Sequence, residues 1–317
     1  MRVTVVGAGI NGCAAAWALR QRGADVRLVD QFEPGHSRGS SHGRARIFRL
    51  AYPEERWVEL AEEALAGWRD LERQSGTPLL ELYGFVQLCS NIAVSSRDML
   101  ERRGIEHRLL DAGELPVALP DGWVAVWQRD AGIIRADAAL AAFRRGLPVE
   151  HRRIESLDDV DADVVVVTTG PWITELVPDV QVRVTRETVA YFRYDGAPLP
   201  SIVELDPATR HHAMYALHDP VHGLKAGAHH SGHVSDPNVE QPPDPRLLAV
   251  VTRWVAARFP GVKPEPVAAE TCFYTTTEDE SFVLERRGRM VVGSACSGHG
   301  FKFAPAVGRR LADLALG

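Results

Sequence analysis

The first thirty residues carry the pattern that most constrains the fold. Residues 2–6 are a short β-branched run, typical of a strand that is buried on both faces. Gly7, Gly9 and Gly12 follow with the spacing G-x-G-x-x-G, and a helix and a second strand come after them. In such a unit the first glycine permits a tight turn, the second lets a pyrophosphate approach the backbone, and the third lets helix and strand pack closely. The pattern predicts a Rossmann-like nucleotide-binding domain with phosphates at a helix N-terminus.

Asp30 stands at the end of the second strand of this unit. A carboxylate at this position can accept hydrogen bonds from the hydroxyls of an adenosine ribose, and it disfavours a 2′-phosphate. The prediction rests on the order of strand, glycines, helix, strand and acid, because the glycine motif alone is a weak signal. The pattern does not distinguish NAD from FAD.

Composition and charge narrow the class of protein. The chain has 317 residues, enough for two lobes, and its 45% hydrophobic and 25% charged residues are typical of a soluble enzyme. A net charge of -6 gives no reason to expect a nucleic acid or an anionic membrane as partner. No apolar run is long enough to span a bilayer, and the N-terminus lacks the basic region and cleavage site of a signal peptide.

The cysteines and histidines indicate whether the protein has disulfides and whether it binds a metal ion. The four cysteines are scattered without a CxxC pair, which argues against a zinc site and a disulfide framework. We therefore expect a cytoplasmic location. Seven histidines between His211 and His233 leave metal binding as an alternative, but their spacing matches no zincin-type motif and we expect no metal.

The remaining periodicities outline a two-domain chain. Helical patterns cover residues 53–74, 136–145, 245–255 and 304–316, and strand patterns cover residues 85–88, 164–167, 180–194 and 290–293. We predict an α/β (α+β) fold in which a mostly antiparallel β domain is inserted into a discontinuous Rossmann-like domain. The nucleotide domain is expected at residues 1–80, 130–180 and 270–317, and the substrate domain at residues 81–129 and 181–269. The turn with Gly170 and Trp172 follows a buried valine strand, where α/β sheets place ligands.

Four segments show a family resemblance. They read VVGAGINGCAAA, GSSHGRARIFRLAY, HGLKAGAHH, and CFYTTTEDESF together with SGHGFKFAP. With them the chain resembles the monomeric sarcosine oxidase and N-methyltryptophan oxidase family, within the wider D-amino-acid-oxidase-like fold. The resemblance runs nearly end to end, and the last two segments are far more specific than the glycine motif. It implies FAD as the cofactor.

The resemblance implies a covalent flavin. Cys272 matches the cysteine that forms a thioether with the 8α-methyl carbon of FAD in this family. The chemistry needs a thiolate, which a partly electropositive pocket would favour. Taken without its flanking residues, Cys272 would be interpreted as a buried core cysteine, and the flanking match reverses that interpretation. The family positions that contact the cofactor are here Gly7, Gly9, Gly12, Asp30, Ser41, Arg46, Gly170, Trp172, Cys272, Gly298, Gly300, Phe301 and Lys302.

The resemblance also implies a substrate site. Arg49 and Lys302 match the two residues that pair with the substrate carboxylate, and a guanidinium fork suits that group. Arg46 matches the residue that packs over the flavin ring, and Lys225 matches the lysine that activates dioxygen, where a cation stabilises superoxide. Further pocket positions, which could orient the amine and hold it neutral, are His42, Tyr52, Tyr215, His229 and Tyr274. Tyr215 needs a one-residue gap. Solvated surface charges are the plain alternative for the lysines and arginines.

These observations predict an FAD-dependent amine oxidase. It would oxidise an N-methyl or cyclic secondary amino acid to an imine by hydride transfer, and O2 would reoxidise the flavin to give hydrogen peroxide. Three alternatives stay open: a non-covalent FAD amino-acid oxidase or dehydrogenase with another acceptor, an NAD-linked dehydrogenase, and a non-catalytic flavin-binding subunit. The chain is short for the family between residues 145 and 164 and after its last helix. We expect a monomer or weak oligomer.

Overall fold

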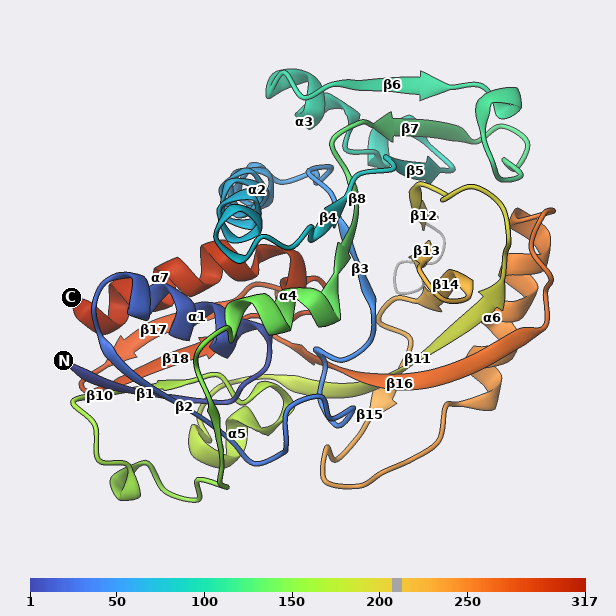
Figure 1. The fold of residues 1–317 in the computed structure, drawn as a ribbon. Coiled ribbons are helices and arrows are strands. Elements are labelled where there is room, and N and C mark those ends of the chain that lie inside the picture. The colour runs from blue at the N-terminus through green and yellow to red at the C-terminus, as the bar shows by residue number, and fades with distance from the viewer. Residues whose placement is uncertain (207–212) are drawn as a thin grey trace.

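The chain folds into three sheets with helices packed on them, and the mixed α/β prediction is confirmed (Figure 1). The computed structural model describes residues 1–206 and 213–317. His211 and His212, from the histidine-rich stretch noted in the sequence, lie outside the described residues. A six-stranded and a nine-stranded sheet form the two lobes, and a three-stranded sheet stands beside them.

The first sheet holds the nucleotide-binding unit. Its order is β17-β18-β10-β1-β2-β9, and all neighbouring pairs are parallel except β17 with β18. The strands are β1 (Arg2–Val6), β2 (Asp25–Asp30), β9 (Val149–His151), β10 (Val164–Val167), β17 (Val283–Arg287) and β18 (Met290–Ser294). Because both faces are covered, the central strands are apolar throughout, and β10 is four consecutive buried valines.

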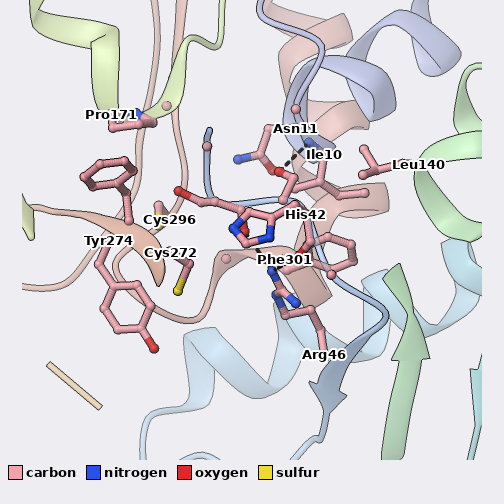
Figure 2. Close-up of a pocket in the computed structure, with 18 of the residues that line it drawn as sticks. Ile10, Asn11, His42, Arg46, Leu140, Pro171, Cys272, Tyr274, Cys296 and Phe301 are labelled. Atoms are coloured by element: carbon pink, nitrogen blue, oxygen red, sulfur yellow. Dashed lines mark hydrogen bonds between the residues drawn. The ribbon is translucent and has the colours of Figure 1, made fainter. Parts of the chain in front are cut away.

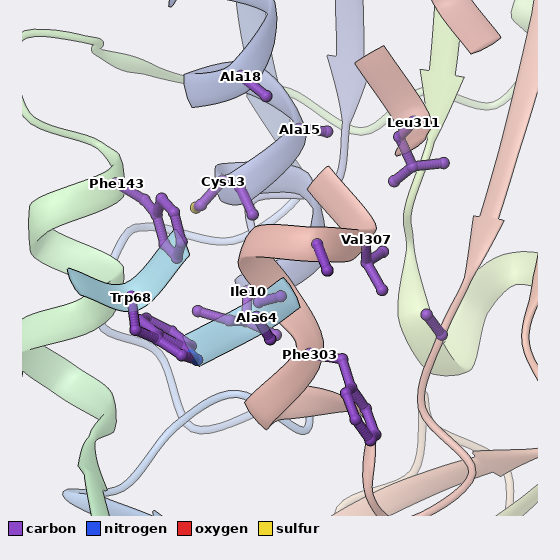
Figure 3. Packing of buried hydrophobic residues seen from close by; sticks show 14 of the residues in the cluster. Ile10, Cys13, Ala15, Ala18, Ala64, Trp68, Phe143, Phe303, Val307 and Leu311 are labelled. Carbon is purple, nitrogen blue, oxygen red and sulfur yellow. The ribbon is translucent and has the colours of Figure 1, made fainter. Parts of the chain in front are cut away.

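Helices cover both faces of this sheet. One face carries α1 (Ile10–Gln21), α2 (Glu55–Ser75), α4 (Ala136–Phe143) and α7 (Ala304–Leu316), and the other carries α5 (Ile173–Leu176). Cys13, Trp68, Phe143, Phe303 and Val307 meet in the core between the helices (Figure 3). The apolar face predicted for α2 is buried there, and Gly76 ends the helix in the left-handed conformation at φ 66°.

The second sheet is mostly antiparallel. Its order is β15-β11-β14-β13-β12-β5-β7-β6, with β16 paired to β11, and only the β12–β5 pair among those described is parallel. The strands are β5 (Phe85–Cys89), β6 (His107–Leu110), β7 (Val124–Gln128), β11 (Arg183–Arg193), β12 (Ser201–Leu205), β13 (Met214–Asp219), β14 (Gly223–Ala228), β15 (His233–Val234) and β16 (Pro266–Thr276). Helix α6 (Pro245–Arg258) packs on one face and covers the helix predicted over residues 245–255, with Asp244 as its N-cap and Pro245 in its first turn.

Smaller elements complete the fold. The third sheet, in the order β3-β8-β4, contains β3 (Ala45–Phe48), β4 (Leu80–Glu81) and β8 (Gly132–Arg135). Helix α3 (Arg97–Arg102) precedes β6. The short 3-10 turns are η1 (Ile92–Val94), η2 (Ala112–Glu114), η3 (Leu157–Asp159), η4 (Gly170–Trp172) and η6 (Gly300–Phe303).

The long strand β16 (Pro266–Thr276) belongs to the second sheet and crosses one of the proposed domain limits. Strands β11 and β16 each have 11 residues and are the longest strands of the second sheet. Strand β16 runs through residue 270, where the sequence analysis places a domain boundary, and β17 then returns to the first sheet. The division into two domains stays a proposal.

The glycine turn has the conformation that the fingerprint requires. Gly7 has φ 101°, which favours glycine. A Cβ on Gly12 would lie 1.8 Å from the Gly7 carbonyl oxygen and 2.5 Å from Oγ1 of Thr168. The helix therefore begins at Ile10, within the fingerprint, and packs directly on the turn.

Candidate active site

A cavity lies between the two lobes. It has a volume of ≈ 490 Å³ and is lined by the glycine turn, the loop before β3, η4, η6 and one face of the second sheet. Figure 2 shows Asn11, His42, Arg46, Cys272 and Phe301 around it. Every residue that the sequence analysis assigned to the site lines this cavity except Gly12 and Tyr52, which pack immediately behind its wall.

The glycine turn and its neighbours form one end of the cavity. Asp30 accepts hydrogen bonds from the backbone N–H of Ala8 at 2.6 Å and of Phe32 at 2.9 Å. Ser41 accepts one from the N–H of Ile10 at 3.0 Å. The carboxylate thus braces the turn, a role that the sequence analysis missed, and ribose recognition by Asp30 stays a prediction. Gly9 also faces the cavity.

Gly170 and Trp172 lie in η4 beside this end. Gly170 has φ 55°, a left-handed conformation. The Trp172 indole N–H donates to Oδ1 of Asn238 at 2.9 Å, and its ring packs 5.2 Å from the ring of Phe32. Trp172 therefore closes the wall by packing, and its polar atom is already satisfied.

Arg46 is a fixed cation at the middle of the cavity. Its guanidinium donates to the backbone carbonyls of Ala45, Ser40 and His42 at 2.9, 2.9 and 2.6 Å. Its Cζ lies 5.4 Å from the centre of the Phe301 ring. Backbone carbonyls hold the side chain without neutralising its charge, so Arg46 stays available to an anionic or electron-rich group.

Strand alternation places Lys225 on the cavity face of the second sheet. In the pairing register Leu217 and Tyr191 flank Lys225, and all three side chains point to the same face. Lys225 is 4% exposed. Burial, and then the charge of Arg46, lower the pKa of Lys225 to about 8.

The His42 side chain is neutral at pH 7. Burial, followed by the charge of Arg46, lowers its pKa to about 4. Its Nδ1 lies 3.7 Å from Oε2 of Glu270, and its buried Nε2 has no hydrogen-bond partner.

Cys272 lies on β16 at the cavity wall, together with Cys296 (Figure 2). Burial raises the pKa of the Cys272 thiol to about 12, although Arg46 and Lys225 act in the opposite direction. The expected cations are present, but desolvation outweighs them, so the thiol is protonated at neutral pH in this structure.

A second pair of cations lies near η6. The Arg49 guanidinium stacks 4.0 Å from the centre of the Tyr52 ring and donates to the Ala51 carbonyl. Lys302 Nζ donates to the carbonyl of His299 at 2.7 Å and lies 5.6 Å from the Tyr52 ring centre. Burial, and then the charge of Arg49, lower the pKa of Lys302 well below its usual value.

The three cations share one property. Arg46, Arg49 and Lys302 form no ion pair with any carboxylate in the described ranges 1–206 and 213–317, whereas Lys225 faces Glu270. Lys302 is buried and the two arginines are half-buried, and cations without a counter-charge in such surroundings favour binding of an anion.

His229 and Tyr274 form a neutral pair opposite these cations. His229 Nδ1 lies 3.1 Å from the Tyr274 hydroxyl. Burial, and next the charge of His230, lower the pKa of His229 well below its usual value, while burial raises that of Tyr274. Gly298 leaves space for both rings. Its φ is 70°, and a Cβ added there would lie 2.6 Å from a ring carbon of His229 and 2.6 Å from a ring carbon of Tyr274.

Two further glycines shape the same wall. A Cβ on Gly227 would lie 2.5 Å from the Tyr215 hydroxyl, so the Tyr215 ring rests on that backbone. A Cβ on Gly300 would lie 2.0 Å from the Ala295 carbonyl oxygen. The segment 298–303 therefore packs closely on the preceding chain, and it carries Phe301 and Lys302 to the cavity.

Sequence reasoning missed Glu270, Tyr191 and His299. Glu270 stands two residues before Cys272, so strand alternation could have placed both on one face. A second signal was available: the chain contains three lysines, Lys225, Lys263 and Lys302, and two of them are buried at the cavity. A buried lysine in a chain that otherwise uses arginine indicates a site.

The described residues contain neither a candidate metal cluster nor a helix that could span a membrane. Within residues 1–206 and 213–317, no group of three or more His, Cys, Asp or Glu side chains could hold a metal ion. In the same ranges no helix is long and apolar enough to cross a membrane.

Comparison with known proteins identifies the family. Residues 2–314 match the family described as FAD dependent oxidoreductase. Peroxisomal sarcosine oxidase of Mus musculus is 32% identical over 98% of this chain and 91% of its own length. Monomeric sarcosine oxidase of Bacillus sp. (strain B-0618) is 27% identical over 99% and 92%.

Among solved structures, one similar fold is that of NikD, an unusual amino acid oxidase essential for nikkomycin biosynthesis. The two structures superpose with a TM-score of 0.85 at 24% sequence identity. The match covers 99% of this chain and 93% of NikD. The family match decides between NAD and FAD in favour of FAD, and it removes the alternative of a non-catalytic subunit. The chain belongs to the FAD dependent oxidoreductase family and is a flavoprotein oxidoreductase similar to the sarcosine oxidases.

Proposed function

We propose that this enzyme oxidises a secondary amino acid, with an N-methyl or cyclic amine, to an imine and passes the electrons to O2. The observation that carries the proposal is the pair Arg49 and Lys302, two cations at the cavity without a carboxylate partner among the described residues. A substrate carboxylate is the counter-charge that fits them. Sarcosine and N-methyl-L-tryptophan are substrates in the names of similar proteins.

The cavity fits FAD by its own geometry. The turn at Gly7 and the close packing at Gly12 leave the N-terminus of α1 open to a pyrophosphate. Helix α7 begins after η6 and directs its N-terminus towards the cavity, where its dipole favours negative charge on a bound ring. Arg46, fixed by three carbonyls, would lie against that ring.

FAD would accept the hydride, and residues of the chain would bind and orient the substrate. FAD, when bound, supplies the hydride acceptor and passes two electrons to O2. Overall the amine loses a hydride from carbon and a proton from nitrogen, and O2 gains both as hydrogen peroxide. Arg49 and Lys302 bind the carboxylate and so orient the reacting C–H bond. Water can then hydrolyse the imine.

The chain also sets the protonation state of the amine. An ammonium cannot easily release a hydride, so the substrate has to bind as a neutral amine. The positive charges of Arg49 and Lys302 disfavour an ammonium next to them. His229 and Tyr274 are neutral and can hydrogen-bond to an uncharged amine nitrogen. His42 and Tyr215 complete the polar wall in this proposal.

Lys225 is assigned to the reaction with O2. One-electron transfer to O2 creates superoxide, and a fixed ammonium at the cavity wall stabilises that anion. The ammonium form requires a pH below the pKa of Lys225, which is about 8.

Cys272 is proposed as the covalent attachment point of FAD. Forming the thioether replaces the S–H bond and one 8α-methyl C–H bond by a C–S bond, and the two electrons and two protons released convert O2 to hydrogen peroxide. The thiol has to ionise first, and the charges of Arg46 and Lys225 lower its pKa against the effect of burial. Acid precipitation tests the link: yellow colour in the pellet, lost in Cys272→Ala, supports it, and colour only in the supernatant refutes it.

A substrate panel tests the function. Peroxide release is measured with N-methylglycine, N-methyltryptophan and proline, and with the methyl ester of each. The proposal expects turnover of at least one free acid and a strong loss with its ester. Equal turnover of acid and ester would refute carboxylate recognition, and reduction without peroxide would point to another electron acceptor.

Location and assembly remain part of the proposal. The four cysteines are free thiols in the described structure, which suits the reducing cytoplasm. We propose a cytoplasmic monomer or weak oligomer. Cell fractionation and size-exclusion chromatography with light scattering test both statements.

A further inference from the structure

Glu270 is a carboxylate placed next to Lys225. It lies on β16, two residues before Cys272, and faces the same side of that strand. Strand β11 stands between β16 and β14, and Val189 pairs with Glu270 on one side and with Gly227 on the other. The Glu270 side chain crosses this strand, so that its Oε1 lies 3.5 Å from Lys225 Nζ.

The carboxylate is held from two further sides. The Tyr191 phenol, 3% exposed, donates a hydrogen bond to Oε1. His42 Nδ1 lies 3.7 Å from Oε2. Burial alone would raise the pKa of Glu270, but the charge of Lys225, the hydrogen bond from Tyr191 and the charge of Arg46 lower it below its usual value, so Glu270 is ionised. A carboxylate with this many partners has little freedom to move.

Gly43 closes the cluster. It has φ 88°, and a Cβ there would lie 3.2 Å from Glu270 Oε1, 3.4 Å from Arg46 Nη1 and 3.6 Å from Lys225 Nζ. The backbone of Gly43 therefore packs directly against all three charged groups. The charged or titratable groups that act on Lys225 come from every neighbouring element: His42, Arg46, Tyr191, Asp219, Glu270 and Cys272.

We propose that Glu270 is a positioning residue that keeps Lys225 protonated and fixed at the cavity wall. The inference rests on the proposed function of Lys225 in the reaction with O2. Two influences disfavour the ammonium of Lys225, namely burial and the neighbouring Arg46, whereas Glu270 is the nearest influence that favours it. Without this carboxylate, two cations would share a dry site with no counter-charge in contact.

Glu270 does not cancel the positive field of the cavity. Arg46 and Lys225 carry two positive charges, Glu270 carries one negative charge, and His42 is neutral at pH 7, so these four groups carry a net single positive charge, while Asp219 pairs with Arg44 and His222 instead of Lys225. Lys225 and Arg46 line the cavity, and Glu270 is not among its lining residues. A ligand in the cavity therefore meets the ammonium and the guanidinium first, with the carboxylate behind them.

The scarcity of lysine makes the proposal directly measurable. The chain has three lysines, so a protein with 13C at every lysine Cε gives three signals. Lys225→Met and Lys263→Arg assign them in the FAD-loaded enzyme. The chemical shift of the Lys225 signal is then followed against pH in wild type, in Glu270→Gln and in the matched control Glu278→Gln, an exposed carboxylate just beyond β16.

The proposal expects a lower titration midpoint for Lys225 in Glu270→Gln. Removing an opposite charge within contact distance moves such a midpoint by about 1–3 pH units, here downward. Glu278→Gln should leave the midpoint in place. An unchanged or raised midpoint in Glu270→Gln would overturn the proposal.

Two further variants cover the case in which Glu270→Gln fails to fold. Glu270→Asp keeps a carboxylate near Lys225 and should lower the midpoint by less than Glu270→Gln. Tyr191→Phe keeps the Glu270 carboxylate but removes the hydrogen bond that it accepts from Tyr191. The titration midpoint of Lys225 should then shift by less than it does in Glu270→Gln. A midpoint that moves as much in Glu270→Asp as expected for Glu270→Gln would contradict a charge effect.

A kinetic readout separates this proposal from the proposed function. In Glu270→Gln the rate of reoxidation by O2 should fall off at lower pH than in wild type, with reduction by substrate retained. If Lys225→Met reoxidises as fast as wild type, the assigned role of Lys225 fails, while the NMR midpoint still decides whether Glu270 controls the charge of Lys225.

Discussion

Lys225 is a buried cation whose neighbours decide its charge. Its side chain is 4% exposed, and Arg46 adds a second positive charge nearby. The pKa of about 8 that results places the loss of the charge near physiological pH. The sequence motif points to Lys225 but not to Glu270, the carboxylate that the structure places 3.5 Å from it. That placement depends on contacts across three strands, which no local pattern shows.

Lys225→Met should separate the two half-reactions. Reduction of the flavin by substrate should survive, because Lys225 forms no part of the proposed carboxylate site. Reoxidation by O2 should slow by about 10²–10³-fold, the usual loss when a preorganised electrostatic group is removed. Stopped-flow absorbance measures both rates, and Lys263→Met, an exposed lysine, serves as the control. Equal losses in both half-reactions would refute the assigned role.

The rate of reoxidation should also depend on pH. Since the pKa of Lys225 is lowered to about 8, the ammonium dominates below that pH and is lost above it. The second-order rate constant with O2 should therefore fall as pH rises through about 8, and Lys225→Met should abolish this step. A wild-type rate that rises across the same range would contradict the account.

Arg49 should contribute mainly to binding. Truncating a buried partner of a charge pair typically costs about 2–5 kcal/mol of binding free energy. Arg49→Ala should therefore raise the apparent Kd for a carboxylate substrate by about 30-fold or more. Titration of the flavin spectrum with an unreactive carboxylic acid measures it, and Arg56→Ala, an exposed arginine, is the control. Unchanged affinity would remove Arg49 from the site.

At the scale of elements, the fingerprint and the strand alternation account for most of the site. The order strand, glycines, helix and strand predicted the turn, and the structure confirms its geometry at Gly7 and Gly12. The sequence could not show that Asp30 braces this turn through Ala8, because that contact arises only when β1 and β2 pair. It also could not show that desolvation raises the pKa of the Cys272 thiol, which depends on long-range packing of β16 on β11.

Gly12→Ala should disrupt this element. The added Cβ would lie 1.8 Å from the Gly7 carbonyl oxygen, so backbone has to shift. We expect loss of FAD and a free energy of unfolding lowered by about 1–3 kcal/mol or more. Gly113→Ala is the control, because a Cβ there meets nothing within 4 Å, and it should change stability by about 0.5 kcal/mol at most. Normal FAD content in Gly12→Ala would contradict the packing argument.

At the scale of the whole molecule, both sheets contribute residues to one cavity. The glycine turn follows β1 of the first sheet, whereas Lys225 and Cys272 belong to the second. The sequence predicts a discontinuous nucleotide domain from the patterns at its start, middle and end, and that division stays a prediction. It could not predict the orientation of the two sheets, which fixes the distances between the assigned residues.

FAD should therefore stabilise the whole chain. In Cys272→Ala, which should release its cofactor, FAD added at a hundred times its Kd should raise the free energy of unfolding by about 2.7 kcal/mol. Thermal melting at increasing FAD concentrations measures this effect, with Gly12→Ala as a variant that should not respond. A melting temperature independent of FAD in Cys272→Ala would show that the cavity is not the cofactor site.

The central claim is that the cavity oxidises a carboxylated secondary amine with FAD. Its most direct test is to mix the purified enzyme with N-methyl and cyclic amino acids without oxygen, record the flavin spectrum, and then admit air. The account predicts that at least one amino acid bleaches the flavin and that air restores it with one hydrogen peroxide per flavin. The account is contradicted if the flavin stays oxidised with every amino acid of the panel, or if the corresponding esters bleach it equally fast.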